Sequence, residues 1–172
     1  MANSFTGNGD LSNYLSIIGS TGGYAVVDTS ANVASNIDSL KSNLTYISSI
    51  TLSDTNPLSI TATQLTSAAT VLNKIVSNYT LAVSGVSVAN IRTVLADTHV
   101  ATVSLSDSSA NIASNLDILQ SNVSKISSII QTGTVATLAI TATQLSSDTL
   151  VLAKISGVSL AVSGVSLSLI HI

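Results

Sequence analysis

The chain has 172 residues, a net charge of -3 and no cysteine. With only five Lys and Arg residues it lacks the basic surface that phosphate binding needs, so no nucleic-acid partner is expected. The absence of cysteine excludes disulfides, thiolate catalysis and cysteine-based metal sites, and it fits a reducing or an oxidising compartment. Ser and Thr interrupt every apolar run, so no segment approaches the roughly 20 apolar residues of a membrane span.

Residues 1–23 are predicted to form a degenerate half-repeat that caps the fold. Leu11, Tyr14 and Leu15 can line one face of a short helix. Residues 1–5 contain neither the basic segment nor the continuous apolar segment that begins a secretory signal peptide. Export would therefore require another signal.

The rest of the chain is an internal duplication. Aligning the sequence on itself with a shift of about 79 residues matches most positions. The matched pairs are Asp28–Asp38 with Asp107–Asp117, Ile60–Leu65 with Ile140–Leu145, Leu72–Ile75 with Leu152–Ile155, and Leu81–Ser87 with Leu160–Ser166. We therefore predict one repeat over residues 24–102 and a second, truncated repeat over residues 103–166.

Each copy is predicted to contain short strands that alternate with amphipathic helices. Alternation of apolar and small polar residues indicates strands that begin at Leu81, Val103, Leu138 and Leu160. An additional short strand is predicted within residues 47–52 and within the matching residues 126–130.

The longest predicted helices follow Asp28 and Asp107. Apolar residues recur there at steps of three and four, so one face can pack against a sheet. They are Val33, Ile37, Leu40, Leu44 and Ile47 in the first copy, and Ile112, Leu116, Leu119, Val123 and Ile126 in the second. Asp, Ser and Thr just before each stripe can accept hydrogen bonds from the first helical turn, which indicates where the helices begin.

A strand, a crossover helix and a second strand in the same direction form a right-handed unit in nearly all cases. Stacked repetition of such units predicts an α/β fold, namely a right-handed α/β solenoid of short parallel strands and amphipathic helices in two long tandem repeats. We expect a core of Val, Ile and Leu, because aromatic residues make up only 3% of the chain.

The last six residues, 167–172, break the repeat. The repeat predicts a helix like the one that starts at Val88, but the chain continues as Leu-Ser-Leu-Ile-His-Ile. This hexapeptide is the translation of a transposon-derived sequencing adaptor. We therefore expect a non-native tail on a metagenomic fragment, and no role for His171.

Asp28, Asp107 and Asp54 are the candidate metal ligands, because Ca²⁺ prefers carboxylate and carbonyl oxygens. The chain lacks the D-x-[DN]-x-[DN]-G loop and the G-G-x-G-x-D array, however. In the structural interpretation Asp28 and Asp107 cap helices, while Asp38 and Asp117 lie on a polar helix face. We therefore predict no bound metal and no other cofactor.

A catalytic centre is not predicted. Only His99 and Asp97 could be combined with a serine into a Ser-His-Asp arrangement, and no G-x-S-x-G motif accompanies them. The expected position of His99 is a solvated loop over residues 96–99, between a helix and a strand. A hydrolase would need a deep pocket that joins His99 to a serine and an acid.

Six asparagines recur on or near one helical face. They are Asn32, Asn36 and Asn43 in the first copy and Asn111, Asn115 and Asn122 in the second. Such amides can bind carbohydrate, but aromatic platforms are expected beside them, so we interpret these asparagines as solvated surface residues. The paired threonines of Thr61–Thr63 and Thr141–Thr143 are interpreted as turn and cap residues.

The repeated S-D-[ST]-[SA]-A-N-[IV]-A-S-N-[LI]-D, the I-T-A-T-Q-L strand and turn, and the L-x-V-S-G-V-S segment resemble repeats of large bacterial secreted proteins of the RTX or hemolysin-type, adhesin-like group. The resemblance covers residues 24–166. It implies an extracellular or cell-surface location, export through a type I system, and Ca²⁺ elsewhere in the parent protein.

We therefore expect a non-catalytic structural repeat segment, a spacer or adhesive stalk, whose partners are neighbouring repeats of the parent chain. The alternative function is a glycan- or protein-binding module that uses the solenoid surface.

Overall fold

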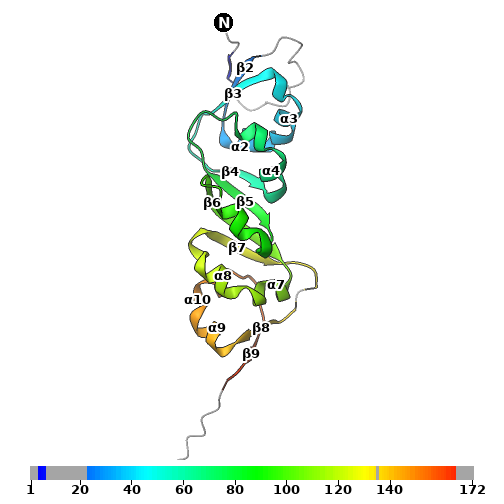
Figure 1. Cartoon of the computed structure of the whole chain (residues 1–172), viewed down its shortest axis with the longest axis vertical. Coiled ribbons are helices and arrows are strands. Elements are labelled where there is room, and N and C mark those ends of the chain that lie inside the picture. Colours follow the sequence, from blue (N-terminus) through cyan, green and yellow to red (C-terminus); the bar gives the residue numbers. More distant parts are fainter. Residues whose placement is uncertain (1–3, 7–22, 135, 166–172) are drawn as a thin grey trace, which may run out of the picture. The chain divides into compact units, whose positions relative to one another are not determined.

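The computed structural model of the chain describes residues 4–6, 23–134 and 136–165 (Figure 1). It divides into two compact units. Unit 1 comprises Met1–Ser84 with Val94–Ala101, and unit 2 comprises Gly85–Thr93 with Thr102–Ile172. Both units combine parallel strands with short helices, which confirms the mixed α/β class. Most of the predicted cap, residues 1–23, and the predicted tail, residues 167–172, lie outside the described residues.

Unit 1 begins with a parallel three-stranded sheet in the order β1-β2-β3. Its strands are β1 (Ser4–Thr6), β2 (Tyr24–Asp28) and β3 (Ile47–Leu52), and β2 is connected to β3 by α2 (Ser30–Ser35), α3 (Ile37–Ser42) and the 3-10 helix η1 (Leu44–Tyr46). A second parallel pair consists of β4 (Leu58–Thr61) and β5 (Leu81–Val86), connected by α4 (Ala62–Ser67) and α5 (Ala69–Leu72).

After β5 come the 3-10 helix η2 (Val88–Asn90), α6 (Ile91–Leu95) and β6 (Val100–Asp107). Unit 2 then repeats the order of unit 1, with α7 (Ser109–Ser114), α8 (Leu116–Ser121), the 3-10 helix η3 (Val123–Lys125), β7 (Ile126–Gln131), β8 (Leu138–Thr141), α9 (Ala142–Ser147), α10 (Thr149–Leu152) and β9 (Leu160–Ser163). Strand β6 pairs in parallel with β7, and β8 pairs in parallel with β9.

The strands predicted from the sequence are all present. Those expected at Leu81, Leu138 and Leu160 begin at these residues, and Val103 lies within β6. The additional strands are β3 and β7. Both carry the same irregularity, because their pairing with the preceding strand skips Ser48 in one copy and Ser127 in the other.

The single long helix predicted after each aspartate is wrong. In the second copy α7 ends at Ser114, Asn115 separates it from α8, and the predicted stripe then continues into η3 and β7. Asn115 leaves the helical region at φ -125° and ψ 17°, and its side-chain amide donates to the carbonyl of Asn111 at 2.8 Å. A short polar side chain that bonds the helix backbone in this way competes with continued helix.

Most of the residues predicted to form the core are nevertheless buried. Ile112, Leu116 and Leu119 are fully buried, as are Val33, Ile37 and Leu40 in the first copy. Val123 and Leu44 are only half-buried, because they lie in the 3-10 turns η3 and η1. The largest fully buried side chains of the described residues are all Ile or Leu, as expected from the scarcity of aromatic residues.

Helices in this fold are short. None of those in the described part of the chain has the length and apolar character that crossing a membrane requires.

Truncation of the buried Leu119 side chain should therefore destabilise the fold. We expect Leu119→Ala to lower the free energy of unfolding by about 2–5 kcal/mol, because it leaves a cavity beneath α8. Urea titration followed by circular dichroism measures the change. The control is Leu150→Ala on α10, where the leucine is 60% exposed, and its cost should stay within about 0.5 kcal/mol. Equal costs for the two variants would contradict this assignment of the core.

Candidate functional site

Asp28 and Asp107 hold the turn between a strand and a helix in each copy. One carboxylate oxygen of Asp28 accepts from the Thr29 N–H at 2.7 Å and from the Asn32 amide at 2.8 Å. The matching oxygen of Asp107 accepts from the Ser108 N–H at 2.8 Å and from the Asn111 amide at 2.7 Å. The two aspartates therefore stabilise local structure.

The expectation that these aspartates are the helix caps requires a correction by one residue. The N-caps are Thr29 and Ser108, whose hydroxyl oxygens accept from the backbone N–H three residues later. A hydroxyl or carboxylate oxygen can cap only if the backbone places it over the first turn, and the aspartates lie at the ends of β2 and β6.

Asp54 reaches the same turn as Asp28 from a loop. Its carboxylate accepts from the Ser30 hydroxyl at 2.7 Å, from the Ser30 N–H at 3.3 Å and from the Asn56 N–H at 3.1 Å. The bond from the Ser30 side chain is the main reason that the pKa of Asp54 lies below its ordinary value. In the second copy the buried hydroxyl of Ser109 donates instead to the side-chain oxygen of Gln131.

This difference bears on the metal-site hypothesis. The serine at the start of the helix donates to a carboxylate in the first copy and to an amide oxygen in the second, although Gln131 matches Leu52 and not Asp54. The serine therefore requires a hydrogen-bond acceptor and not a negative charge. Asp28 and Asp54 meet around the start of α2, whereas Asp107 belongs to unit 2. Among the described residues, no group of three or more His, Asp or Glu side chains is placed to hold a metal ion.

Burial also acts on Asp107. It disfavours the charged carboxylate, but hydrogen bonds from Asn111, Val88 and Ser108 outweigh it, so the pKa of Asp107 is lowered. These three donors stabilise the charged carboxylate against the cost of its burial.

The recurrent asparagines have structural roles that the sequence interpretation as solvated residues missed. The amides of Asn36, Asn43 and Asn122 donate to carbonyls four residues earlier, as Asn115 does. The side chain of an asparagine at the end of a helix therefore donates to a carbonyl of the last helical turn. Thr61 and Thr141 form capping boxes with Gln64 and Gln144, which confirms the cap interpretation.

The predicted loop around His99 borders an open hollow of about 340 Å³ in unit 1. His99 is exposed, as expected, and its ring stacks on Tyr79 with centroids 4.3 Å apart and planes 6° apart. The Nδ1 atom of His99 lies 3.0 Å from an oxygen of Asp97. Leu65, Ala69 and Leu72 provide the apolar wall, and Asn73 lines the rim.

The hollow brings His99 and Asp97 together but does not complete a hydrolytic triad. None of the described residues that line it is a serine. The pKa of Tyr79 is raised, first by burial and then by the negative charge of Asp97, so its phenol keeps its proton at neutral pH. The hollow therefore offers an aromatic stack, a carboxylate and an amide, which can bind a polar ligand.

Asp38 and Asp117 occupy matching positions but have different neighbours. Asp38 accepts from the Gln64 side chain at 3.1 Å. Asp117 lies near Asp148, which is only 2% exposed and has one carboxylate oxygen without a hydrogen-bond donor. The residue that matches Asp148 in the first copy is Ala68. This difference between the copies was the one feature of the sequence that could have indicated the buried acid.

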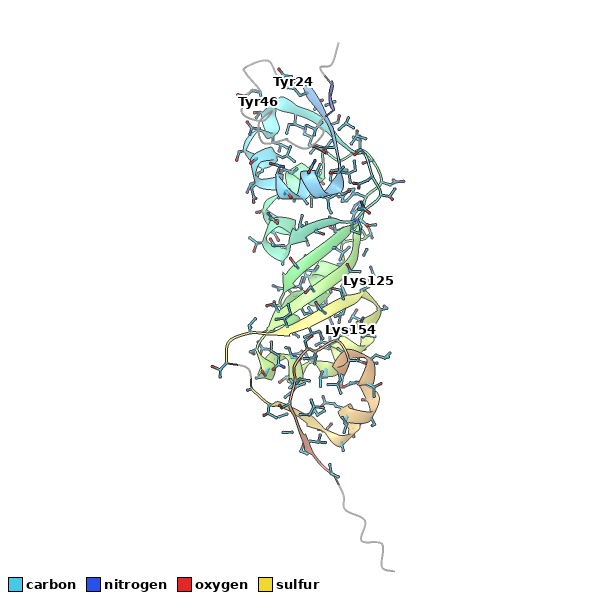
Figure 2. The ribbon with its side chains drawn as sticks, turned by 180° about the vertical axis from the view of Figure 1, so that it is seen from behind. Tyr24, Tyr46, Lys125 and Lys154 are labelled. Carbon is cyan, nitrogen blue, oxygen red and sulfur yellow. The ribbon has the colours of Figure 1, made fainter. Side chains whose placement is uncertain are left out.

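Aromatic positions are not shared between the copies either. Tyr46 in η1 corresponds to Lys125 in η3, and Figure 2 shows these side chains within their respective units. A tyrosine platform at this position would therefore not recur along a repeated structure.

Comparison with known proteins gave no match. No protein-family model, curated protein or solved structure matched this chain.

Removing the buried acid should stabilise unit 2 at neutral pH. Burial raises the pKa of Asp148, and Asp117 raises it further, so folding favours the protonated form. Asp148→Asn should therefore be more stable than the natural chain at pH 7, by about 1–3 kcal/mol. The difference should shrink as the pH falls through the raised pKa toward 3.8, the ordinary value, because protonation then favours the folded natural chain.

Chemical denaturation at a series of pH values measures this difference. Asp38→Asn, at the position that matches Asp117, is the control and should not reproduce the pH dependence. A variant at Asp148 that is less stable than the natural chain at pH 7 would contradict the assignment.

Proposed function

We propose that the chain is a non-catalytic structural repeat segment, a spacer or adhesive stalk of a large bacterial surface or secreted protein. In this proposal the two copies stack as a right-handed α/β solenoid. The observation that carries it is the recurrence of the same backbone contacts at matching positions of the two copies.

The recurrence extends to individual hydrogen bonds. The Ser53 N–H donates to the Asp28 carbonyl at 2.8 Å, and the Thr132 N–H donates to the Asp107 carbonyl at the same distance. The isolated bridge between Ile50 and Ile75 returns between Ile129 and Ile155. Such agreement supports one repeating structural unit, because repeat proteins are stabilised by equivalent contacts between successive elements.

Differences between the copies support the same interpretation. Leu58 faces Leu81 in the first copy and Leu138 faces Leu160 in the second, so the paired strands keep their register. The spacing changes by one residue only between β3 and β4 and between α5 and β5, compared with the matching loops of the second copy. Loops tolerate such changes because no packed element is displaced.

Partners, cofactors and location follow from the repeat resemblance and remain part of the proposal. The partners are neighbouring repeats of the parent chain, and the location is extracellular or on the cell surface. The segment itself uses no cofactor, and any Ca²⁺ belongs to other parts of the parent protein.

An added repeat tests the scaffold proposal. Residues 87–165 are inserted a second time after Val165, whose counterpart in the first copy is Val86. We expect the longer chain to keep the same ellipticity per residue and to unfold at a higher temperature, because a new interface between neighbouring repeats forms. Circular dichroism and calorimetry measure both quantities.

The control insertion contains residues 97–165 and lacks α6, so it should give no stabilisation. An in-register insertion that aggregates, or that unfolds in a separate transition at lower temperature, would contradict a stacked repeat.

The hollow beside Tyr79 and His99 favours glycan binding as the second candidate function. Sugar rings stack on aromatic side chains, and their hydroxyl groups form hydrogen bonds with carboxylates and amides such as Asp97 and Asn73.

We expect saturable binding to a member of a glycan panel, weakened about tenfold or more by Tyr79→Ala. Tyr46→Ala is the matched control and should leave the affinity unchanged. No saturable binding by the natural chain, or equal binding by both variants, would rule out this hollow as a glycan site.

A further inference from the structure

The sequence contains three N-x-[ST] acceptor motifs for N-linked glycosylation. They are Asn43-Leu44-Thr45, Asn78-Tyr79-Thr80 and Asn122-Val123-Ser124. A folded chain can be modified at such a motif only where the asparagine amide and the hydroxyl two residues later reach a transferase, so usable motifs lie in surface loops. The structure separates the three motifs by this criterion.

Two of the motifs are held at helix ends. Asn43 is the C-cap of α3 and Asn122 is the C-cap of α8, and both are half-buried. Their side-chain amides donate to the carbonyls of Ser39 at 2.9 Å and of Ile118 at 2.8 Å. The hydroxyl residues of these two motifs lie in the 3-10 helices η1 and η3. Each amide nitrogen is therefore engaged, and the motif can be extended only if the helix end opens.

Asn78 lies instead in the irregular segment between α5 and β5. It is exposed, and its side chain forms no hydrogen bond with any described residue. Tyr79 and Thr80 also have irregular backbone, and Thr80 is exposed. The amide and the hydroxyl of this motif are therefore accessible without any change in secondary structure.

Hydrogen bonds on both sides of Asn78 hold this segment in place within unit 1. The hydroxyl of Ser77 accepts from the Leu52 N–H at 2.9 Å. The carbonyl of Thr80 accepts from the Leu58 N–H at 2.9 Å. An anchored backbone thus presents a free side chain to solvent, and modification of that side chain breaks neither of these bonds.

We propose that Asn78 is an acceptor site for N-linked glycosylation of the folded chain. The co-substrate is a sugar activated as a glycosyl phosphate ester. The Asn78 amide nitrogen forms a bond to the anomeric carbon, and the bond from that carbon to the phosphate oxygen breaks. The phosphate leaves with the bonding electron pair, and the amide nitrogen loses one proton to a base of the transferase. This inference concerns an attached glycan, so it rests neither on the stacking of repeats nor on glycan binding in the hollow.

The site belongs to one copy of the repeat. Gly157 matches Asn78 in the second copy, so that copy has no acceptor at this position. A glycan at Asn78 adds a large, hydrated group to a chain in which only 8% of the residues are charged. The expected consequence is a more soluble surface around the loop that connects α5 to β5.

Incubation of the purified, folded chain with a soluble N-glycosyltransferase and UDP-glucose tests the proposal. We expect the added mass of one hexose, which peptide mapping places on Asn78. Modification there should be about tenfold or more faster than at Asn43 or Asn122, because those two amides must first release a helix carbonyl. Asn78→Gln and Thr80→Ala should each abolish the product, and the matched control Thr45→Ala should leave it unchanged. Circular dichroism confirms that each variant is folded.

Synthetic peptides of residues 40–48, 75–83 and 119–127 separate the effect of the fold from that of the local sequence. We expect their rates of modification to differ less than those of the same sites in the folded chain. A folded chain that is unmodified at Asn78, or that is modified there no faster than at Asn43 or Asn122, would overturn the proposal. An equal preference in the peptides would show that local sequence selects the site, which overturns the structural argument.

Discussion

Parallel strand pairing is the constraint on which the rest of this structure depends. Two parallel strands cannot be joined by a tight turn, so each pair needs a crossover long enough to return to the starting edge. In this chain the crossovers are pairs of short helices, such as α4 and α5 between β4 and β5. Leu58 and Leu81 face each other across such a pair and are both fully buried. The same requirement explains why apolar residues recur in every strand and every crossover.

Short helices create many helix ends, and polar side chains form hydrogen bonds with the backbone groups there. Each helix leaves N–H groups at its start and carbonyl groups at its end without partners. Thr61 with Gln64 satisfies the start of α4, and Asn36 satisfies carbonyls at the end of α2. The abundant Ser, Thr and Asn residues therefore have structural roles within the repeat. Their number alone is not evidence for a binding surface.

Positions where the copies differ are more informative about function than positions where they agree. The pairing of Ser30 with Asp54 becomes Ser109 with Gln131, and this change keeps the hydrogen bond while it removes the charge. Ala68 becomes the buried Asp148, which places an acid without a donor next to Asp117. The stack of His99 on Tyr79 likewise has no counterpart, because none of residues 156–159, which match the segment around Tyr79, is aromatic. A repeated scaffold can carry local features of this kind without loss of its register.

Duplication and periodicity were enough to locate the strands, the turns and the buried residues, since Ile112, Leu116 and Leu119 had to share one face at their spacing. They could not show that the helix breaks at Asn115, because the apolar stripe continues through the break and only the side-chain bond to Asn111 reveals it. Nor could they show that Asp54 meets Ser30 or that Asp97 and His99 border a hollow with Tyr79. The sequence by itself determined the repeated strand and crossover pattern, which depends on neighbours along the chain. Tertiary structure decided which polar groups meet, because those contacts join residues from different elements whose distance is set by packing.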